Sequence, residues 1–136
     1  MRILIIAPSD TGYAELDTIP EVQAIQEKHT TFVLSGRDTT YEKVFDTARR
    51  WRCDAVHVAG HSDENGVPLS GGGKLSADDL AMICRLCHAT MIMFNSCYSG
   101  KLASYCVRHG VAFAFFANVK ITDSQAWRYA LGFYNS

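Results

Sequence analysis

RILIIAP, the stretch from Arg2 to Pro8, is almost wholly apolar, rich in β-branched residues and closed by a proline. A continuous apolar run without polar alternation is typical of a strand buried on both faces of a parallel sheet. Parallel neighbours must be joined by long crossovers, which are usually helices. The rest of the chain should therefore alternate between strands and helices.

This alternation extends along the whole chain. The expected strands are Arg2 to Pro8, Thr30 to Leu34, Asp54 to Ala59, Met91 to Phe94 and Val111 to Ala117, and the expected helices are Glu21 to His29, Thr40 to Trp51, one that begins at Ser76, Ser99 to His109 and Asp123 to Tyr134. Five such units predict an α/β three-layer sandwich with a mostly parallel five-stranded sheet and the flavodoxin-like strand order 2-1-3-4-5. Residues Gly60 to Lys74 are expected to form a polar, glycine-rich loop, flexible at Gly71-Gly72-Gly73-Lys74.

Length, charge and cysteine count narrow the class of protein. The 136 residues make one ordinary domain, 1–136, and 13 basic against 14 acidic side chains give a net charge of -1, which disfavours a nucleic-acid binder. No stretch approaches the ~18 apolar residues of a membrane span, and the run Ile3 to Ala7 is too short for a secretory signal. Five cysteines, an odd number, are then expected to be reduced thiols of a soluble cytoplasmic protein without membrane contact.

The residues just beyond the strands are the candidates for function, because ligands of such sheets bind beyond the carboxyl ends of the strands. His61 comes after the third expected strand and Cys97 after the fourth, and these strands should be neighbours. An imidazole can take the proton of a thiol, and a position just before a helix lowers the thiol pKa further. Backbone N–H groups of Ser62 and Cys97 are placed to face a developing oxyanion. Taken singly, His61 or Cys97 is better explained as an ordinary packed or loop residue. Their occurrence together at one edge of the sheet favours a catalytic role.

Four motifs in order carry a family resemblance. They are GHS at 60–62, KLSADDLA at 74–81, MIMFNSCYSG at 91–100 and ITDSQAWRYALGFY at 121–134. Together they resemble the CHAT family of caspase-like cysteine peptidases, in which a strand ending in Gly-His precedes a Leu-Ser/Thr-Ala-Asp-Asp-Leu helix start and an apolar strand ending in Ser-Ala-Cys-x-Ser-Gly. The resemblance covers roughly residues 54 to 134.

The resemblance implies a caspase-like fold and a His/Cys dyad. His61 would be the general base and Cys97 the nucleophile that forms a thioester, with the main-chain amides of Ser62 and Cys97 as the oxyanion site. By position in the family, Asp10, Asn95 and Asp123 would line the first substrate pocket and favour a basic residue before the scissile bond. The resemblance also implies a protein or peptide substrate, an activating protein partner, and a bacterial stress or anti-phage context.

Two departures from the family pattern concern the substrate cleft. Ser62 replaces the glycine usual after the histidine, and Asn95-Ser96 replaces Ser-Ala before the cysteine. A CHAT domain would also be expected to continue beyond Ser136 with another strand and pocket-forming loops, so we expect a domain truncated at its C-terminus. A catalytically silent scaffold that binds a partner therefore remains an alternative.

Other signals are discounted, and neither a cofactor nor a metal is expected. Cys84-Arg85-Leu86-Cys87-His88 spells a haem-attachment motif, but helical spacing puts both sulfurs on a buried stripe with Leu80 and Ile83. A zinc site would need two more ligands at suitable spacing. His57, inside a strand, is expected to be a hydrogen-bonded core residue. The hydroxyl-rich loop from Ser9 to Ala14 leaves a flavin mononucleotide module as a weaker alternative.

Overall fold

The computed structural model describes residues 1–9, 11–13, 17–37, 39–95, 99–116, 128 and 132–134. Three of the expected site residues, Asp10, Cys97 and Asp123, lie outside these described residues. The expected helix from Asp123 to Tyr134 also lies mostly outside them, although Arg128 and the stretch 132–134 are helical. All strands of the central sheet lie within the described residues.

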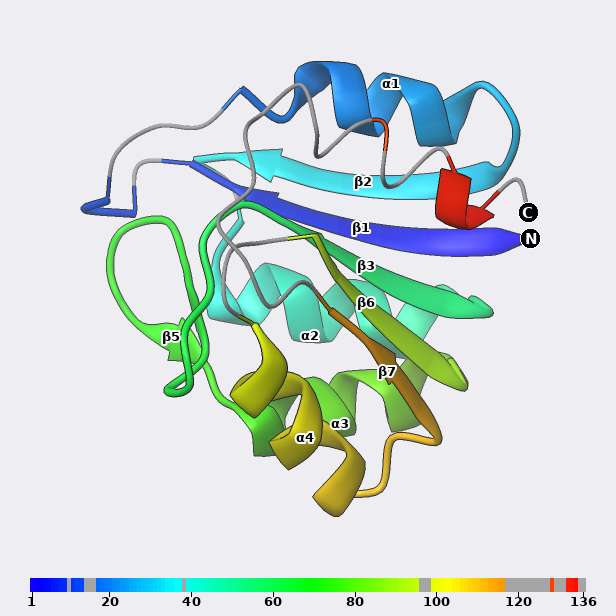
Figure 1. Cartoon of the computed structure of the whole chain (residues 1–136). Coiled ribbons are helices and arrows are strands. Elements are labelled where there is room, and N and C mark those ends of the chain that lie inside the picture. The colour runs from blue at the N-terminus through cyan, green and yellow to red at the C-terminus, as the bar shows by residue number, and fades with distance from the viewer. Residues whose placement is uncertain are drawn as a thin grey trace.

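The centre of the molecule is a parallel five-stranded sheet, as the sequence predicts (Figure 1). Its strands are β1 (Arg2–Pro8), β2 (Thr30–Gly36), β3 (Ala55–Ala59), β6 (Met91–Asn95) and β7 (Phe113–Phe115). They are ordered β2-β1-β3-β6-β7, and every pairing is parallel. This is the expected order 2-1-3-4-5, because two short additional strands, β4 and β5, intervene in the numbering. The fold-class prediction is confirmed.

Helices cover both faces of the sheet. The described helices are α1 (Ile19–Gln26), α2 (Tyr41–Arg50), α3 (Ala77–Cys87) and α4 (Gly100–Arg108). In Figure 1, α1 and the red C-terminal residues lie above the sheet, and α2, α3 and α4 lie below it. Helix α1 begins two residues earlier than expected, since Pro20 in its first turn is preorganised for a helix start.

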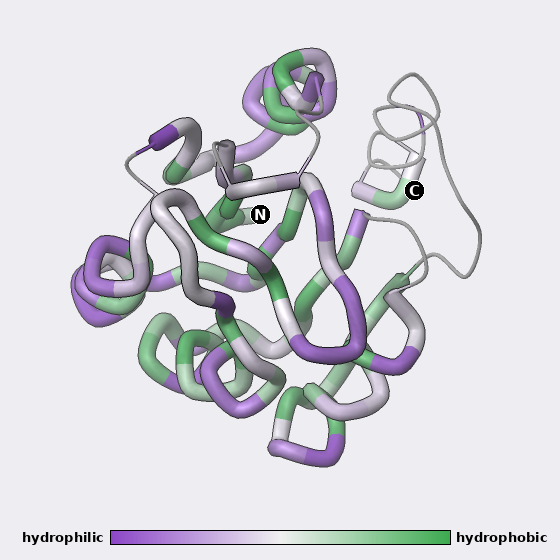
Figure 2. The backbone as a smooth tube through the Cα atoms, turned by 90° about the vertical axis from the view of Figure 1, so that its left-hand side faces the viewer, coloured by the Kyte–Doolittle hydropathy of each residue, from purple (hydrophilic) through white to green (hydrophobic). Residues whose placement is uncertain are grey.

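The apolar core is divided by the sheet into two unequal parts. Successive side chains of β1 point to opposite faces, so Ile3 and Ile5 pack under α1, whereas Leu4 and Ile6 face α2, α3 and α4. Among the described residues, the second face holds most of the buried apolar side chains. In Figure 2 the helices change from purple to green around their turns, which is the amphipathic pattern that such layers require.

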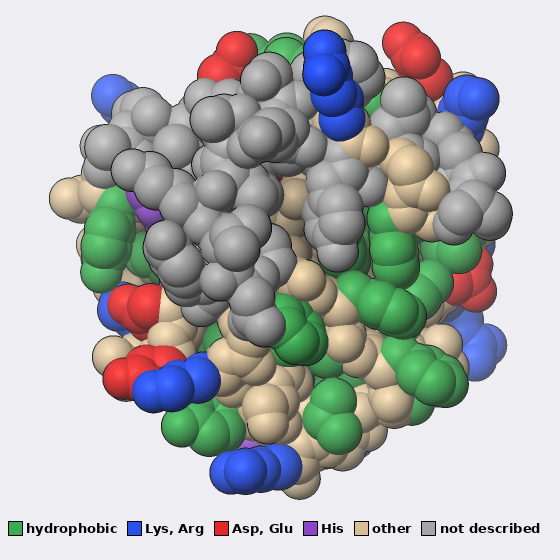
Figure 3. Space-filling model, in the orientation of Figure 1, with side chains coloured by type: hydrophobic (Ala, Val, Ile, Leu, Met, Phe, Trp, Pro, Cys, Tyr) green, Lys and Arg blue, Asp and Glu red, His purple; other side chains and the backbone are tan. Residues whose placement is uncertain are grey.

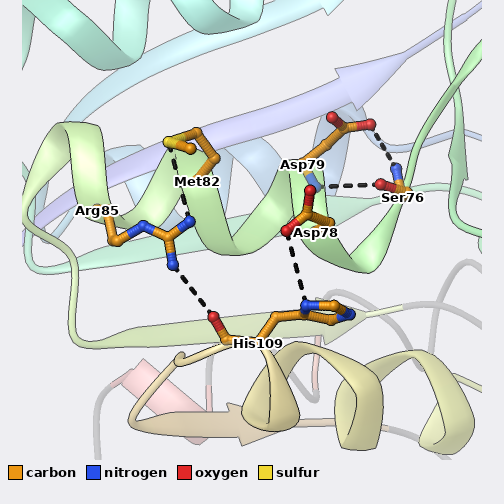
Figure 4. Close-up of polar contacts among 6 residues, drawn as sticks. All are labelled: Ser76, Asp78, Asp79, Met82, Arg85 and His109. Carbon is orange, nitrogen blue, oxygen red and sulfur yellow. Dashed lines mark hydrogen bonds and ion pairs between the residues drawn. The ribbon is translucent and has the colours of Figure 1, made fainter.

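Helix α3 is held by a capping box at its start and by α4 along its side (Figure 4). The Ser76 hydroxyl accepts a hydrogen bond from the N–H of Asp79, and the Asp79 carboxylate accepts one from the N–H of Ser76. At the other end, the Arg85 guanidinium donates to the carbonyl of His109, 3.1 Å away, just beyond α4. The imidazole of His109 lies 3.6 Å from the Asp78 carboxylate. These contacts fix α3 beside α4.

A hairpin lies at the end of the segment that begins at Gly60, and the prediction of a loop as far as Lys74 is wrong for this part. Strands β4 (Val67–Pro68) and β5 (Lys74–Leu75) pair antiparallel. Val67, Leu69 and Leu75 are buried, so apolar side chains fasten the hairpin to the core. Strands of two residues carry no detectable periodicity, which is why the sequence did not reveal them.

Surface charge reflects the balanced composition. In the view of Figure 3, acidic and basic side chains are interspersed around the margin instead of being gathered by sign. The apolar side chains Phe113, Phe115 and Phe116, in and after β7, are more than a third exposed. No helix among the described residues has the length and apolar character to cross a bilayer.

Candidate active site at the carboxyl edge of the sheet

His61 lies just beyond the carboxyl end of β3. All five residues of β3 are buried between β1 and β6, which fixes the direction in which the chain leaves the sheet. Gly60 then turns the chain with φ +124°, a backbone conformation that other residues rarely adopt. The turn brings the chain to the rim, where His61 and Ser62 are partly exposed.

The neighbouring strand β6 ends level with β3. Ala59 and Asn95 are Cα partners in the parallel ladder, and they are the last residues of their strands. Along the sequence, His61 lies two residues after Ala59, and Cys97 lies two residues after Asn95. The register therefore gives the two candidate catalytic residues equal offsets from one paired position. Of these two residues, His61 is among those that the structure describes and Cys97 is not.

Helix α4 begins three residues after Cys97 in the sequence. Its N-cap, Ser99, is fully buried, and its side chain makes no capping hydrogen bond to the first turn. The first N–H groups of a helix carry a partial positive charge that stabilises a nearby anion, a thiolate included. The local order of strand, cysteine and helix is thus the one that favours an activated thiol.

An aromatic ring lies against His61, and a charged pair lies next to that ring. The ring of Tyr13, from the segment after β1, lies against the imidazole with centroids 5.4 Å apart. The Lys74 ammonium lies 5.9 Å from the centre of the Tyr13 ring and 3.0 Å from the Asp63 carboxylate. Lys74, the first residue of β5, and Asp63, in the loop before β4, thus form a charged pair next to the Tyr13 ring. The sequence did not reveal this grouping, because no spacing rule relates residues 13, 61 and 74.

Charge pairing shifts the titration of both members of this pair. The hydrogen bond to Asp63 raises the pKa of the Lys74 ammonium above its ordinary value. Partial burial alone would raise the pKa of the Asp63 carboxyl, but hydrogen bonds from Lys74 and from the Asn65 N–H outweigh it and lower that pKa. Both groups are charged at neutral pH and hold the loop between His61 and β5.

No protein-family model matches this chain, and no curated protein is significantly similar to it. The site must therefore be judged from its own residues. Of the expected pocket residues, Asn95 is buried at the end of β6 and is 3% exposed. The substrate-binding roles of Asn95, Asp10 and Asp123 stay predictions.

A second polar group lies on the α1 face of the same strand. His57 is fully buried in β3, with Nδ1 2.8 Å from the Tyr134 hydroxyl and Nε2 2.5 Å from the Glu21 carboxylate. The prediction that His57 is a hydrogen-bonded core histidine is confirmed. Its partners were missed, because a glutamate in the first turn of a helix is normally solvated and satisfied by the helix dipole.

Helical spacing also accounts for Cys84 and Cys87. Both thiols are buried on the inner side of α3 with Leu80 and Ile83, as the stripe predicts. Within the described ranges, no group of three or more histidine, cysteine or acidic side chains is placed to hold a metal ion.

Proposed function

We propose that this chain is a caspase-like cysteine endopeptidase in which His61 is the general base and Cys97 the nucleophile. The observation that carries the proposal is the pairing of Ala59 with Asn95, from which the two residues have equal sequence offsets. Neighbouring parallel strands leave a sheet in the same direction, about 5 Å apart. Equal offsets therefore favour a separation that allows proton transfer.

The proposed reaction has two halves. His61 takes the proton of the Cys97 thiol, and the sulfur attacks the scissile carbonyl. The carbonyl oxygen becomes an oxyanion that accepts hydrogen bonds from the main-chain N–H groups of Ser62 and Cys97. Collapse of this intermediate breaks the C–N bond, and His61 returns the proton to the departing amine. Water, deprotonated by His61, then hydrolyses the thioester and releases the carboxylic acid and the thiol.

The substrate would be a protein or peptide with a basic residue before the scissile bond. Asp10, Asn95 and Asp123 are the residues we propose for that pocket, since carboxylates favour a cationic side chain. A protein partner would switch the enzyme on, in a bacterial stress or anti-phage response. We place the reaction in the cytoplasm, which suits the four free thiols found among the described residues.

Labelling with peptidyl acyloxymethyl ketones tests the proposal directly. A probe with arginine next to the warhead should modify Cys97 faster than one with aspartate, and mass mapping identifies the labelled residue. Cys97→Ala should abolish labelling with little change in melting temperature, whereas Cys84→Ala, which removes a buried thiol of α3, should still be labelled. His61→Ala should slow labelling by about 10²–10⁴-fold. Equal labelling of the Cys97→Ala protein would refute the proposal.

A second arm does not need an activating partner. The rate of Cys97 alkylation by iodoacetamide reports its thiolate fraction at each pH. In the wild type the reaction should persist below the ordinary thiol pKa, and in His61→Ala the profile should move back toward that value. Superimposable profiles would mean that the imidazole does not assist the thiol.

A catalytically silent scaffold is the second candidate function. The contact between Tyr13 and His61 favours it, because the aromatic ring covers one side of the imidazole. If the protein is a scaffold, the wild type should not be labelled by the probes. The pH profile of Cys97 alkylation by iodoacetamide should then be the same in wild type and in His61→Ala. These outcomes separate the two candidates.

A further inference from the structure

Four buried cysteines gather on the face of the sheet covered by α2, α3 and α4. Cys84 and Cys87 belong to the last turns of α3, Cys106 to α4, and Cys53 to the segment between α2 and β3. All four are free thiols in one apolar cluster. Packing explains why each thiol is buried, but a backbone hydrogen bond also brings Cys53 and Cys87 together.

The backbone joins Cys53 directly to Cys87. The N–H of Cys53 donates to the carbonyl of Cys87, 2.9 Å away. The contact is held on either side, because the Ala89 N–H bonds to the Cys84 carbonyl and the Thr90 N–H to the Asp54 carbonyl. Backbones joined by a direct hydrogen bond lie about 5 Å apart, a separation that a disulfide spans without movement of the chain.

The two sulfurs differ in their readiness to ionise. The Cys53 thiol donates toward the sulfur of Cys87 and lowers the pKa of Cys87, and the Ala89 N–H adds to the effect. The same contact raises the pKa of Cys53. Burial raises the pKa of Cys84, and it raises that of Cys106 to about 12. Among the described thiols, Cys87 is therefore the one whose thiolate is favoured.

We propose that Cys53 and Cys87 are an oxidation site, at which a small hydroperoxide converts the two thiols into a disulfide. The Cys87 thiolate attacks one oxygen of hydrogen peroxide, its O–O bond breaks, and sulfenic acid and water form. The Cys53 sulfur then attacks the sulfenic sulfur, forms the S–S bond and releases a second water. Two thiol hydrogens are lost and one peroxide is reduced to two waters. The inference is independent of the proposed peptidase activity.

Burial sets which oxidants can react. Cys53 is 5% exposed and Cys87 is fully buried, so a small neutral peroxide should reach them during local opening and a bulky aromatic disulfide reagent should not. The cross-link would close a covalent loop that contains β3, His61, the β4–β5 hairpin and α3. Closing this loop restricts the unfolded chain, so the oxidised protein should resist unfolding better than the reduced protein.

Peptide mapping of the peroxide-treated full chain is the test. Free thiols are blocked with iodoacetamide, and the unreduced protein is cut with trypsin. Cleavage after Arg52, Lys74 and Arg85 separates Cys53, Cys84 and Cys87 into different peptides. The expected product is the peptide beginning at Cys53 joined to the peptide beginning at Leu86, lighter by two hydrogens. Fragmentation must assign the link to Cys87 and not to Cys97, which shares that peptide.

Variants and melting complete the experiment. Oxidised wild type should melt roughly 10 °C above its reduced form, and dithiothreitol should remove the shift. Cys84→Ala, the matched control one turn away, should keep the link, and Cys53→Ala should lose it. The wild-type map decides the matter even where a variant fails to fold. An absent link, a Cys87 oxidised further without a link, or a link through Cys84, Cys97 or Cys106 would each overturn the proposal.

Discussion

At the residue scale, Lys74 is the side chain that ties the hairpin to the candidate histidine. Its ammonium pairs with Asp63 and lies over the Tyr13 ring, which in turn contacts His61. The pair is a third or more exposed, so its contribution to stability is only about 0.2–1 kcal/mol. Its value lies in placing Tyr13 and the loop after β3.

The pKa directions make a titration prediction for this pair. The depressed pKa of Asp63 contributes stability above about pH 3.8 that is lost as the pH falls through the folded value. The raised pKa of Lys74 contributes stability below about pH 10.5 that is lost as the pH rises through the folded value. In Lys74→Met, the Asp63 midpoint measured by NMR should therefore rise. The exposed pair Lys101–Glu64 provides a control, because Lys101→Met should leave the Asp63 midpoint in place.

The residues of the site illustrate what a sequence can disclose. His61 was found because a buried strand, a glycine and a histidine stand directly in succession. Tyr13 was not assigned to the site, since its contact with His61 depends on where two loops meet in space. Glu21 was missed because its burial depends on a histidine 36 positions away in β3. Local patterns identify elements and their ends, and tertiary contacts decide the partners.

At the element scale, the β4–β5 hairpin depends on one close approach. A Cβ added at Gly66 would lie 2.2 Å from the carbonyl oxygen of Leu75, closer than any tolerated contact. Gly66 also has φ +134°, and Gly72, in the turn, has φ +97° with open space around it. The two positions share a glycine-like backbone and differ in steric room.

This difference predicts unequal effects of alanine at the two positions. Gly72→Ala should lower the free energy of unfolding by about 1–3 kcal/mol through backbone strain alone. Gly66→Ala should lower it further, because the backbone of β5 must also shift. Denaturant unfolding of the two variants measures the difference. Equal losses of unfolding free energy in the two variants would contradict this prediction, because they would mean that β5 shifts away from the new Cβ at no energetic cost.

Elements also show why the fold was easier to predict than its details. Long apolar runs such as β1 specify a buried parallel strand by composition alone. Strand β7 is Phe113–Phe115, whereas the prediction was Val111 to Ala117. Of the described residues in that range, Phe113 to Phe115 continue the ladder with β6, and Ala117 lies outside the described residues. An apolar sequence signals burial, but the hydrogen-bonded length depends on the neighbouring strand.

At the scale of the whole molecule, His57 joins the sheet to the layer that covers its α1 face. Its ring connects β3 to Glu21 of α1 and to Tyr134 near the C-terminus. Burial raises the pKa of the Tyr134 hydroxyl, and the Glu21 carboxylate adds to the effect. A buried carboxylate is tolerated here because it is paired.

The network predicts strong coupling between Glu21 and His57. His57→Leu should cost about 3–5 kcal/mol, since it leaves the Glu21 carboxylate buried without its partner. The double variant Glu21→Leu/His57→Leu should cost less than His57→Leu alone, because no unpaired charge remains. A double-mutant cycle by denaturant unfolding provides the measurement. Additive losses would contradict the coupling.

The described helices on the two faces of the sheet bury different numbers of residues. Helix α1 buries only Glu21 and Ile25, whereas α3 buries six of its residues. On heating, α1 should therefore detach from the sheet while α3 is still packed against it. His61 follows β3, whose side chains pack on both faces of the sheet. The strand would therefore lose its packing partner on the α1 face first and would still be held by the helices on the other face.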